Sequence, residues 1–206
     1  FDADVWADSI DLQPKTIRRA CLTLPGNTAI GLNNIRFKDV ALLPDNALDD
    51  LGHLIRNMLR NLALPSQVLL KLMILLANKS GGSRTIAILT TIYRLTMRLL
   101  SHTISEWDRE KAGHWDTAVK GCSALQAQIL RTLHLELSHF EGDWIIHFLW
   151  DLRKFYDSVR ITILIERLIE LGYSPHVLIL GLLVHKAPRT FNVGACSSDI
   201  ISGCSR

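Results

Sequence analysis

The chain has 206 residues, enough for one domain or for part of a larger one. With 48% hydrophobic and 21% charged residues, it is neither intrinsically disordered nor fibrous. The net charge of +3 permits a nucleic-acid partner, but only clustered basic residues would argue for one. Its four cysteines show no zinc-ligand spacing, which favours reduced thiols in an intracellular protein, nuclear or cytoplasmic. Charged residues interrupt the longest apolar runs, so we expect no membrane-spanning segment.

The N-terminal part of the chain predicts two helices and a turn. Residues 1–30 show one short helix near Lys15 to Leu22, and residues 28–35 contain a turn marked by Gly31 and two asparagines. A longer helix begins at Pro44-Asp45-Asn46, carries apolar residues at helical spacing on one face, and ends at Pro65.

A β-hairpin follows. The apolar segments Val68–Leu76 and Ile86–Ile88 flank two adjacent glycines, which lie between Lys79 and Arg84. Paired cations and turn amides favour a bound phosphate, so the hairpin is a candidate anion clamp. A solvated hairpin with ordinary surface charges fits these residues equally well.

The next segments read as helices separated by a polar connection. A helix over Leu89–Leu100 places Arg94 and Arg98 one turn apart, where they could bind a nucleic-acid backbone or form a solvated face. We expect a polar connection over Trp107–Thr117 and then a helix over Ala124–Phe140 with Ser123 as its N-cap. The predicted buried stripe of that helix consists of Leu125, Ile129, Leu133 and Leu137.

The central segment is WIIHFLWDLRKFYDSV, residues 144–159. Its apolar run Ile145–Trp150 predicts a buried strand that ends at Asp151. A carboxylate at the exit of a buried strand is costly unless it is solvated, paired or bound to a cation. An exposed acidic turn and a metal ligand both satisfy this condition.

The C-terminal part predicts two helices and a second hairpin. The helices run from after Val159 to Leu171 and from Ser174-Pro175 to about His185, and the strands cover residues 189–194 and 199–201. The whole pattern predicts an α+β fold that is mostly helical, with a small antiparallel sheet.

The segment D-L-R-K-F-Y-D-S-V, which begins at Asp151, resembles the first catalytic motif of reverse transcriptases, especially those of non-LTR retroelements and group II introns. It is also similar to the retroelement-type enzymes of dinoflagellate genomes. The resemblance implies that Asp151 is a catalytic ligand of magnesium and that the backbone carbonyl of Leu152 adds a further ligand. It implies that Tyr156 is the aromatic residue that discriminates the nucleotide sugar, although a packing aromatic is the alternative.

Other segments resemble the same family in the same order. The pattern K-x-G-G-x-R-x-I resembles the fingers motif whose lysine and arginine, here Lys79 and Arg84, contact the nucleotide triphosphate; the family's proline after that arginine is Thr85 here. Gly203 stands where the family has a P-Q-G loop, without its Pro and Gln, and would let the nucleotide approach the backbone. The turn at residues 28–35 resembles, in degraded form, the Gly-x-Asp-Gly turn of many non-LTR enzymes.

The resemblance covers roughly residues 28–206, which would be the reverse transcriptase domain, with residues 1–27 as an N-terminal extension. It implies the fingers and part of the palm of a right-hand polymerase. The implied reaction is RNA-directed DNA synthesis from an RNA template, a DNA primer and deoxynucleoside triphosphates, with two Mg²⁺ ions.

The family's remaining aspartates lie in a Y-x-D-D hairpin that this sequence does not contain. We therefore expect a piece of a longer protein that is inactive alone. One alternative function is a non-catalytic nucleic-acid-binding or maturase-like module derived from a polymerase. Another is an α+β domain whose motif matches are chance.

Overall fold

The structure is a computed structural model that describes residues 2–26, 28–77, 81, 83–113, 116, 121, 123–146, 159–193 and 196–201. The chain divides into two compact units, one formed by residues 1–101 and 174–206 and the other by residues 102–173. The fold is α+β and mostly helical, as predicted, with a small four-stranded sheet. Among the helices of the described ranges, none has the length and apolarity to cross a membrane.

Four helices open the first unit: α1 (Ala3–Asp8), α2 (Pro14–Leu22), α3 (Phe37–Ala41) and α4 (Asp45–Arg60). The longest, α4, is the helix predicted after Pro44, and its apolar face is fully buried at Leu48, Ile55 and Leu59. The helices α1 and α3 were not predicted, because six and five residues are too few to show a helical period.

The residues expected to form an N-terminal extension pack within this unit, since α1 and α2 both lie against α4. Arg56 and Arg60 of α4 donate hydrogen bonds to the Asp8 carboxylate at 3.1 and 2.7 Å. The Trp6 ring stacks on the His176 ring, with ring centroids 4.5 Å apart. These contacts hold the C-terminal half of α1 against α4 and against His176.

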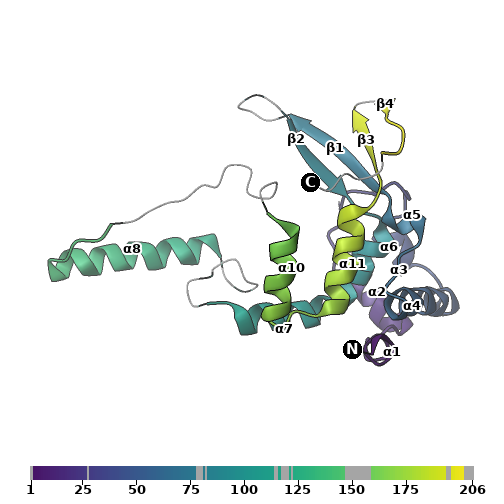
Figure 1. The fold of residues 1–206 in the computed structure, drawn as a ribbon, viewed down its shortest axis with the longest axis horizontal. Coiled ribbons are helices and arrows are strands. Elements are labelled where there is room, and N and C mark those ends of the chain that lie inside the picture. The colour runs from purple at the N-terminus through teal and green to yellow at the C-terminus, as the bar shows by residue number, and fades with distance from the viewer. Residues whose placement is uncertain are drawn as a thin grey trace. The chain divides into compact units, whose positions relative to one another are not determined.

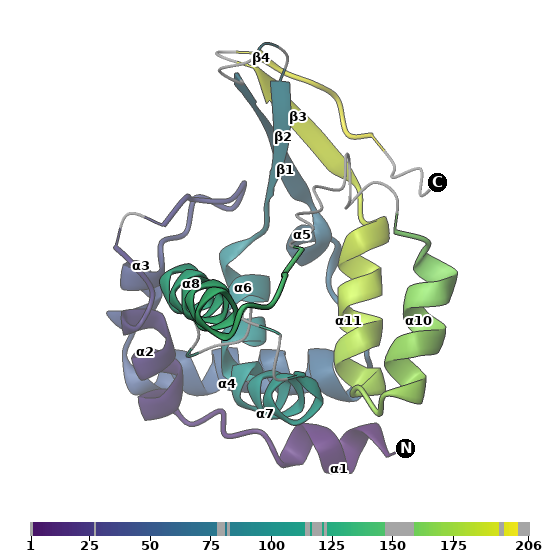
Figure 2. The ribbon, with the colours of Figure 1, turned by 90° about the vertical axis from the view of Figure 1, so that its left-hand side faces the viewer.

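The sheet consists of β1 (Lys71–Ala77), β2 (Ser83–Ile88), β3 (Arg189–Val193) and β4 (Cys196–Ser197) in the order β2-β1-β3-β4. Figures 1 and 2 show these strands extending away from the helices of the first unit. The predicted hairpin is present, because β1 and β2 pair antiparallel. The prediction of a purely antiparallel sheet is wrong, since β1 pairs with β3 in parallel.

The sheet joins segments that are far apart in the chain. The parallel pairing runs from Lys71 opposite Arg189 to Ile74 opposite Asn192. β4 starts before the strand predicted at residues 199–201, of which Ile201 forms an isolated antiparallel bridge to Arg189. β1 therefore lies between β2, its partner in the hairpin, and β3, which pairs in turn with Ile201 of the C-terminal segment.

Three further helices complete the first unit: α5 (Ser66–Leu69), α6 (Thr91–Leu99) and α11 (Pro175–Lys186). The last two were predicted, and both bury apolar side chains, including Leu95 and Leu180. Lys71 is buried, and its Nζ donates to the carbonyl oxygen of His185 at 3.0 Å in the last turn of α11. Burial lowers the pKa of Lys71, and nearby Arg189 lowers it further.

The described helices of the second unit are α7 (Ser101–Lys111), which starts at the last residue of the first unit, α8 (Ala124–Glu141) and α10 (Ile161–Glu170). The expected polar connection is wrong at its start, because Trp107 lies in α7. Its Nε1 donates to the carbonyl oxygen of Leu171 at 3.1 Å, and its ring meets Tyr173 edge-on at 4.8 Å. Trp107 therefore joins α7 to the end of α10.

The helix α8 begins as predicted and ends one residue after the predicted end, but its apolar stripe is not buried. The Ser123 hydroxyl accepts a hydrogen bond from the Gln126 amide at 3.1 Å, and Gly142 ends the helix with a φ of 78°. Leu125, Ile129, Leu133 and Leu137 are 51 to 69% exposed, so the predicted burial is wrong. Helical spacing aligns apolar side chains, but a second element must cover them, and no described element buries a residue of α8.

Candidate functional site

Most of the residues that the sequence assigns to the active site lie outside the described residues. These are Asp151, Leu152, Tyr156, Lys79 and Gly203. Oxygen ligands such as the Asp151 carboxylate suit Mg²⁺ chemically, but the geometry of that site is not described. Within the described ranges, no three His, Cys, Asp or Glu side chains come together as a metal-binding group. The magnesium site therefore stays a prediction.

The strand expected to deliver Asp151 is not formed at its first residues. Ile145 and Ile146 lie outside any strand and are 41 and 77% exposed, so the prediction of a buried strand is wrong at these two positions. They follow Gly142, whose left-handed backbone ends α8, and no strand pairs with them among the described residues. The rest of the predicted strand, residues 147–150, lies outside the described ranges.

Arg84 is the one predicted triphosphate contact that the structure describes. It lies in β2 opposite Leu76 of β1, one pair away from the last pair before the turn. Gly81 supplies the left-handed backbone of that turn, with a φ of 91°. Arg84 is exposed, and no ion pair with it is found in the described part of the chain. Its guanidinium is therefore available to an anion that approaches the hairpin.

The C-terminal segment reaches the same sheet at its other end. Ile201 pairs with Arg189, which lies opposite Lys71 at the start of β1, whereas Arg84 lies near the turn at the end of β1. Arg84 and Ile201 therefore lie near opposite ends of the strands of this sheet.

The two arginines predicted to bind nucleic acid both make contacts within the chain. Arg94 of α6 donates to the carbonyl oxygen of Ala29 at 2.6 Å, and its guanidinium lies 5.0 Å from the centre of the Phe37 ring. Burial lowers the pKa of Arg94. Arg98 is exposed and donates to the Thr23 hydroxyl at 3.2 and 3.3 Å. These bonds hold the N-terminal segments on α6, and contact with nucleic acid stays a prediction.

The expected turn at residues 28–35 lies directly on the start of α6. The amide of Asn34 donates to the carbonyl oxygen of Gly31 at 3.0 Å, and Asn34 has a φ of 51°, which asparagine tolerates better than most residues. The Thr91 hydroxyl donates to the carbonyl oxygen of Ile35 at 2.5 Å. The C-terminal end of the turn, at Ile35, is therefore fixed to the first residue of α6, Thr91.

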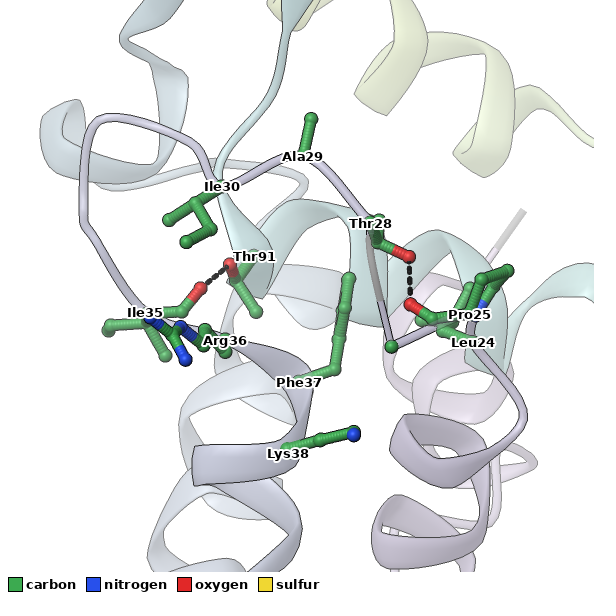
Figure 3. Close-up of a pocket in the computed structure, with 11 residues that line it drawn as sticks. Leu24, Pro25, Thr28, Ala29, Ile30, Ile35, Arg36, Phe37, Lys38 and Thr91 are labelled. Carbon is green, nitrogen blue, oxygen red and sulfur yellow. Dashed lines mark hydrogen bonds between the residues drawn. The ribbon is translucent and has the colours of Figure 1, made fainter.

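Sequence reasoning missed a pocket of about 380 Å³ between this loop and α3, which we call the loop pocket. Figure 3 shows Phe37 at its centre, with Arg36 and Lys38 on either side. Its apolar wall includes Leu24 and Ile30. A sequence signal exists, because Arg36-Phe37-Lys38 places two cations around one aromatic residue, but such a triplet is common on protein surfaces.

Comparison with known proteins adds no relative. No protein-family model matches the chain, and no curated protein matches it.

Proposed function

We propose that the chain forms the fingers and part of the palm of a reverse transcriptase, in which it serves template-directed nucleotidyl transfer. The observation that carries this proposal is the β1–β2 hairpin. Its sequence has the K-x-G-G-x-R pattern, its strands pair antiparallel up to the turn at Gly81, and Arg84 is exposed beside that turn. The helix α6 follows the hairpin and carries a Tyr93-Arg94 pair, as in the family that the sequence resembles.

Each proposed residue has a separate task. Arg84, with Lys79, holds the triphosphate of the incoming nucleotide by charge-assisted hydrogen bonds. Asp151 and the carbonyl of Leu152 hold Mg²⁺, which when bound offsets the negative charge of the transferring phosphoryl group. Tyr156 excludes a 2′-hydroxyl group from the sugar site, and the backbone at Gly203 leaves space for the nucleotide.

The test measures binding of a fluorescent deoxynucleoside triphosphate to the chain with Mg²⁺ and a primer–template duplex. Arg84→Gln should weaken triphosphate binding by about 10- to 150-fold, which corresponds to about 1.5–3 kcal/mol for a charge-assisted hydrogen bond. Binding of the duplex should change far less, because a duplex contacts many cations. Asp151→Asn should remove the dependence of triphosphate binding on Mg²⁺.

Arg19→Gln is the matched control, since Arg19 is an exposed arginine of α2 in the same unit. It removes the same charge and should leave triphosphate binding unchanged. If Arg84→Gln weakens duplex and triphosphate binding equally, the hairpin binds only nucleic-acid backbone, and the alternative of a non-catalytic binding module replaces the polymerase. If the chain binds no triphosphate, the proposed polymerase function is wrong.

A further inference from the structure

We propose that a pocket beside the C-terminal part of α11 binds a medium-chain carboxylic acid such as octanoate, with the alkyl chain on an apolar wall and the carboxylate at Lys186. This pocket, which we call the α11 pocket, has a volume of about 300 Å³, at the lower end of the range for small-molecule sites. It lies where α11 ends and β3 begins, at the base of the sheet (Figure 2). It shares no residue with the hairpin, so the proposal does not depend on the polymerase function.

One face of α11 forms the apolar wall of the α11 pocket. Ile179, Leu182 and Leu183 line it from α11, and Leu69 lines it from α5. Ile179 lies one turn before Leu183, and Leu182 lies one turn before Lys186, so helical spacing brings these side chains to one face. Among the described residues that line the pocket, Lys186 alone carries a charge. The wall therefore favours a ligand with an apolar body.

Lys186 gives the α11 pocket a positive charge at one end of this wall. It is exposed in the last turn of α11, and its ammonium makes no ion pair or hydrogen bond in the part of the chain that the structure describes. A lysine that lines an apolar surface keeps its alkyl stem on that surface and its ammonium in water. A carboxylate at the mouth of the pocket can therefore reach the ammonium, and one cation matches the single charge of a carboxylate.

The segment at the end of α11 is fixed in place without a ligand. The Lys71 amide donates to the carbonyl oxygen of Pro188 at 3.1 Å, and the Lys71 Nζ donates to the carbonyl oxygen of His185 at 3.0 Å. Ala187, which lies between them in the chain and lines the pocket, is 3% exposed. Because these bonds hold residues 185–188 in the free chain, binding costs little ordering of the backbone.

The wall has the length of a medium alkyl chain. The helical rise from Ile179 to Lys186 is about 10 Å, close to the length of extended octanoate. Each methylene group that lies on the wall leaves water, so the affinity should rise with chain length until the chain reaches Ile179.

The experiment is a titration of the nitrogen-labelled chain with butanoate, hexanoate, octanoate and octan-1-ol, followed by the amide signals in two-dimensional NMR. We expect the acids to shift the signals of Leu182, Leu183 and Lys186, and each added methylene to tighten binding by about two- to fourfold. Lys186→Met should weaken octanoate by about two- to fivefold, as for an exposed ion pair, and Lys186→Glu should weaken it further. Both variants should leave octan-1-ol binding unchanged, because the alcohol carries no charge.

The matched control is Lys15→Met, because Lys15 is an exposed lysine of α2 outside the pocket, and its affinity for octanoate should equal that of the parent chain. The proposal is overturned if octanoate does not bind at millimolar concentration, if its affinity does not depend on chain length, or if Lys15→Met and Lys186→Met weaken it equally. Octanoate that shifts the signals of α8, whose apolar residues are exposed, and not those of α11 also overturns it.

A last arm uses vesicles that contain phosphatidylglycerol. Binding to vesicles that requires Lys186, without binding of octanoate, would assign this face to a membrane surface and overturn the proposal. Failure of triphosphate binding at the hairpin with retained octanoate binding would contradict the polymerase proposal alone.

Discussion

Replacing Gly31 with alanine should destabilise the first unit, because its loop lies directly on the start of α6. An added Cβ would lie 2.7 Å from the carbonyl oxygen of Leu89 and 3.2 Å from the Cα of Thr90. Both neighbours are main-chain atoms, which cannot rotate away as a side chain can. An outward shift of about 0.7 Å would bring the closest contact back to the ordinary van der Waals range.

The shift would strain the two hydrogen bonds that hold the loop. These bonds are short, 2.5 Å from Thr91 to Ile35 and 2.6 Å from Arg94 to Ala29, so neither can follow a displaced loop without losing geometry. Inserting a methyl group into a tight contact costs about 1–3 kcal/mol. We expect Gly31→Ala to lower the free energy of unfolding by an amount in this range.

Urea unfolding followed by circular dichroism measures the decrease in the free energy of unfolding. Hydrogen exchange of the α6 amides shows whether the destabilised region is the part of α6 that the loop contacts. Gly181→Ala is the control, because a Cβ at Gly181 meets nothing within 4 Å and lies inside α11. Alanine there should raise the stability by about 0.5–1 kcal/mol. The reasoning is refuted if Gly31→Ala is as stable as the parent and leaves the protection of α6 unchanged.

Three further predictions follow from buried side chains of the first unit. Burial lowers the pKa of His176 below its ordinary value of 6.5. The free energy of unfolding should therefore be full above pH 6.5 and fall as the pH drops below 6.5, because the unfolded chain binds the proton more readily than the folded chain. His176→Phe should abolish this pH dependence, as measured by urea unfolding at several pH values. Burial raises the pKa of the Cys21 thiol to about 11. Iodoacetamide at pH 8 should therefore modify exposed Cys196 well before Cys21, as measured by peptide mass spectrometry. Equal rates of modification would contradict the burial of Cys21. Leu59 is fully buried in α4, so Leu59→Ala should cost about 2–5 kcal/mol in urea unfolding, and a loss below 1 kcal/mol would mean that the helix is not packed there.

Local signals in the sequence predicted most of the helices and the hairpin. The apolar period of α4 and the glycines between β1 and β2 act through residues that are close in the sequence. The helix and the hairpin could therefore be predicted from the sequence alone. The parallel pairing of β1 with β3 could not be read, because it joins segments more than 110 residues apart. Lys71 is a charge within the apolar segment predicted at Val68–Leu76, yet it is buried because the end of α11 supplies a carbonyl for its ammonium group.

Predictions that depend on what covers a surface were less reliable. The apolar residues of α8 were aligned correctly, but their burial needs a covering element that periodicity cannot reveal. The same limit applies to the candidate site. The sequence indicated that Arg94 is a cation on a helix face, and only the packing of the loop shows that its guanidinium is engaged by Ala29 and Phe37.

The position of β2 at one edge of the described sheet has a consequence for how copies of the chain meet. The outer side of an edge strand carries amide and carbonyl groups that another strand can pair with, and nearby Leu76 and Ile86 are exposed apolar residues. A charged side chain on such a strand opposes this association, because two copies would bring like charges together. We therefore expect Arg84 to oppose addition of the hairpin of one molecule to that of another. At high protein concentration, we expect variants that lose this charge to associate by strand pairing between molecules. Arg84→Lys keeps the positive charge, so it should not associate in this way.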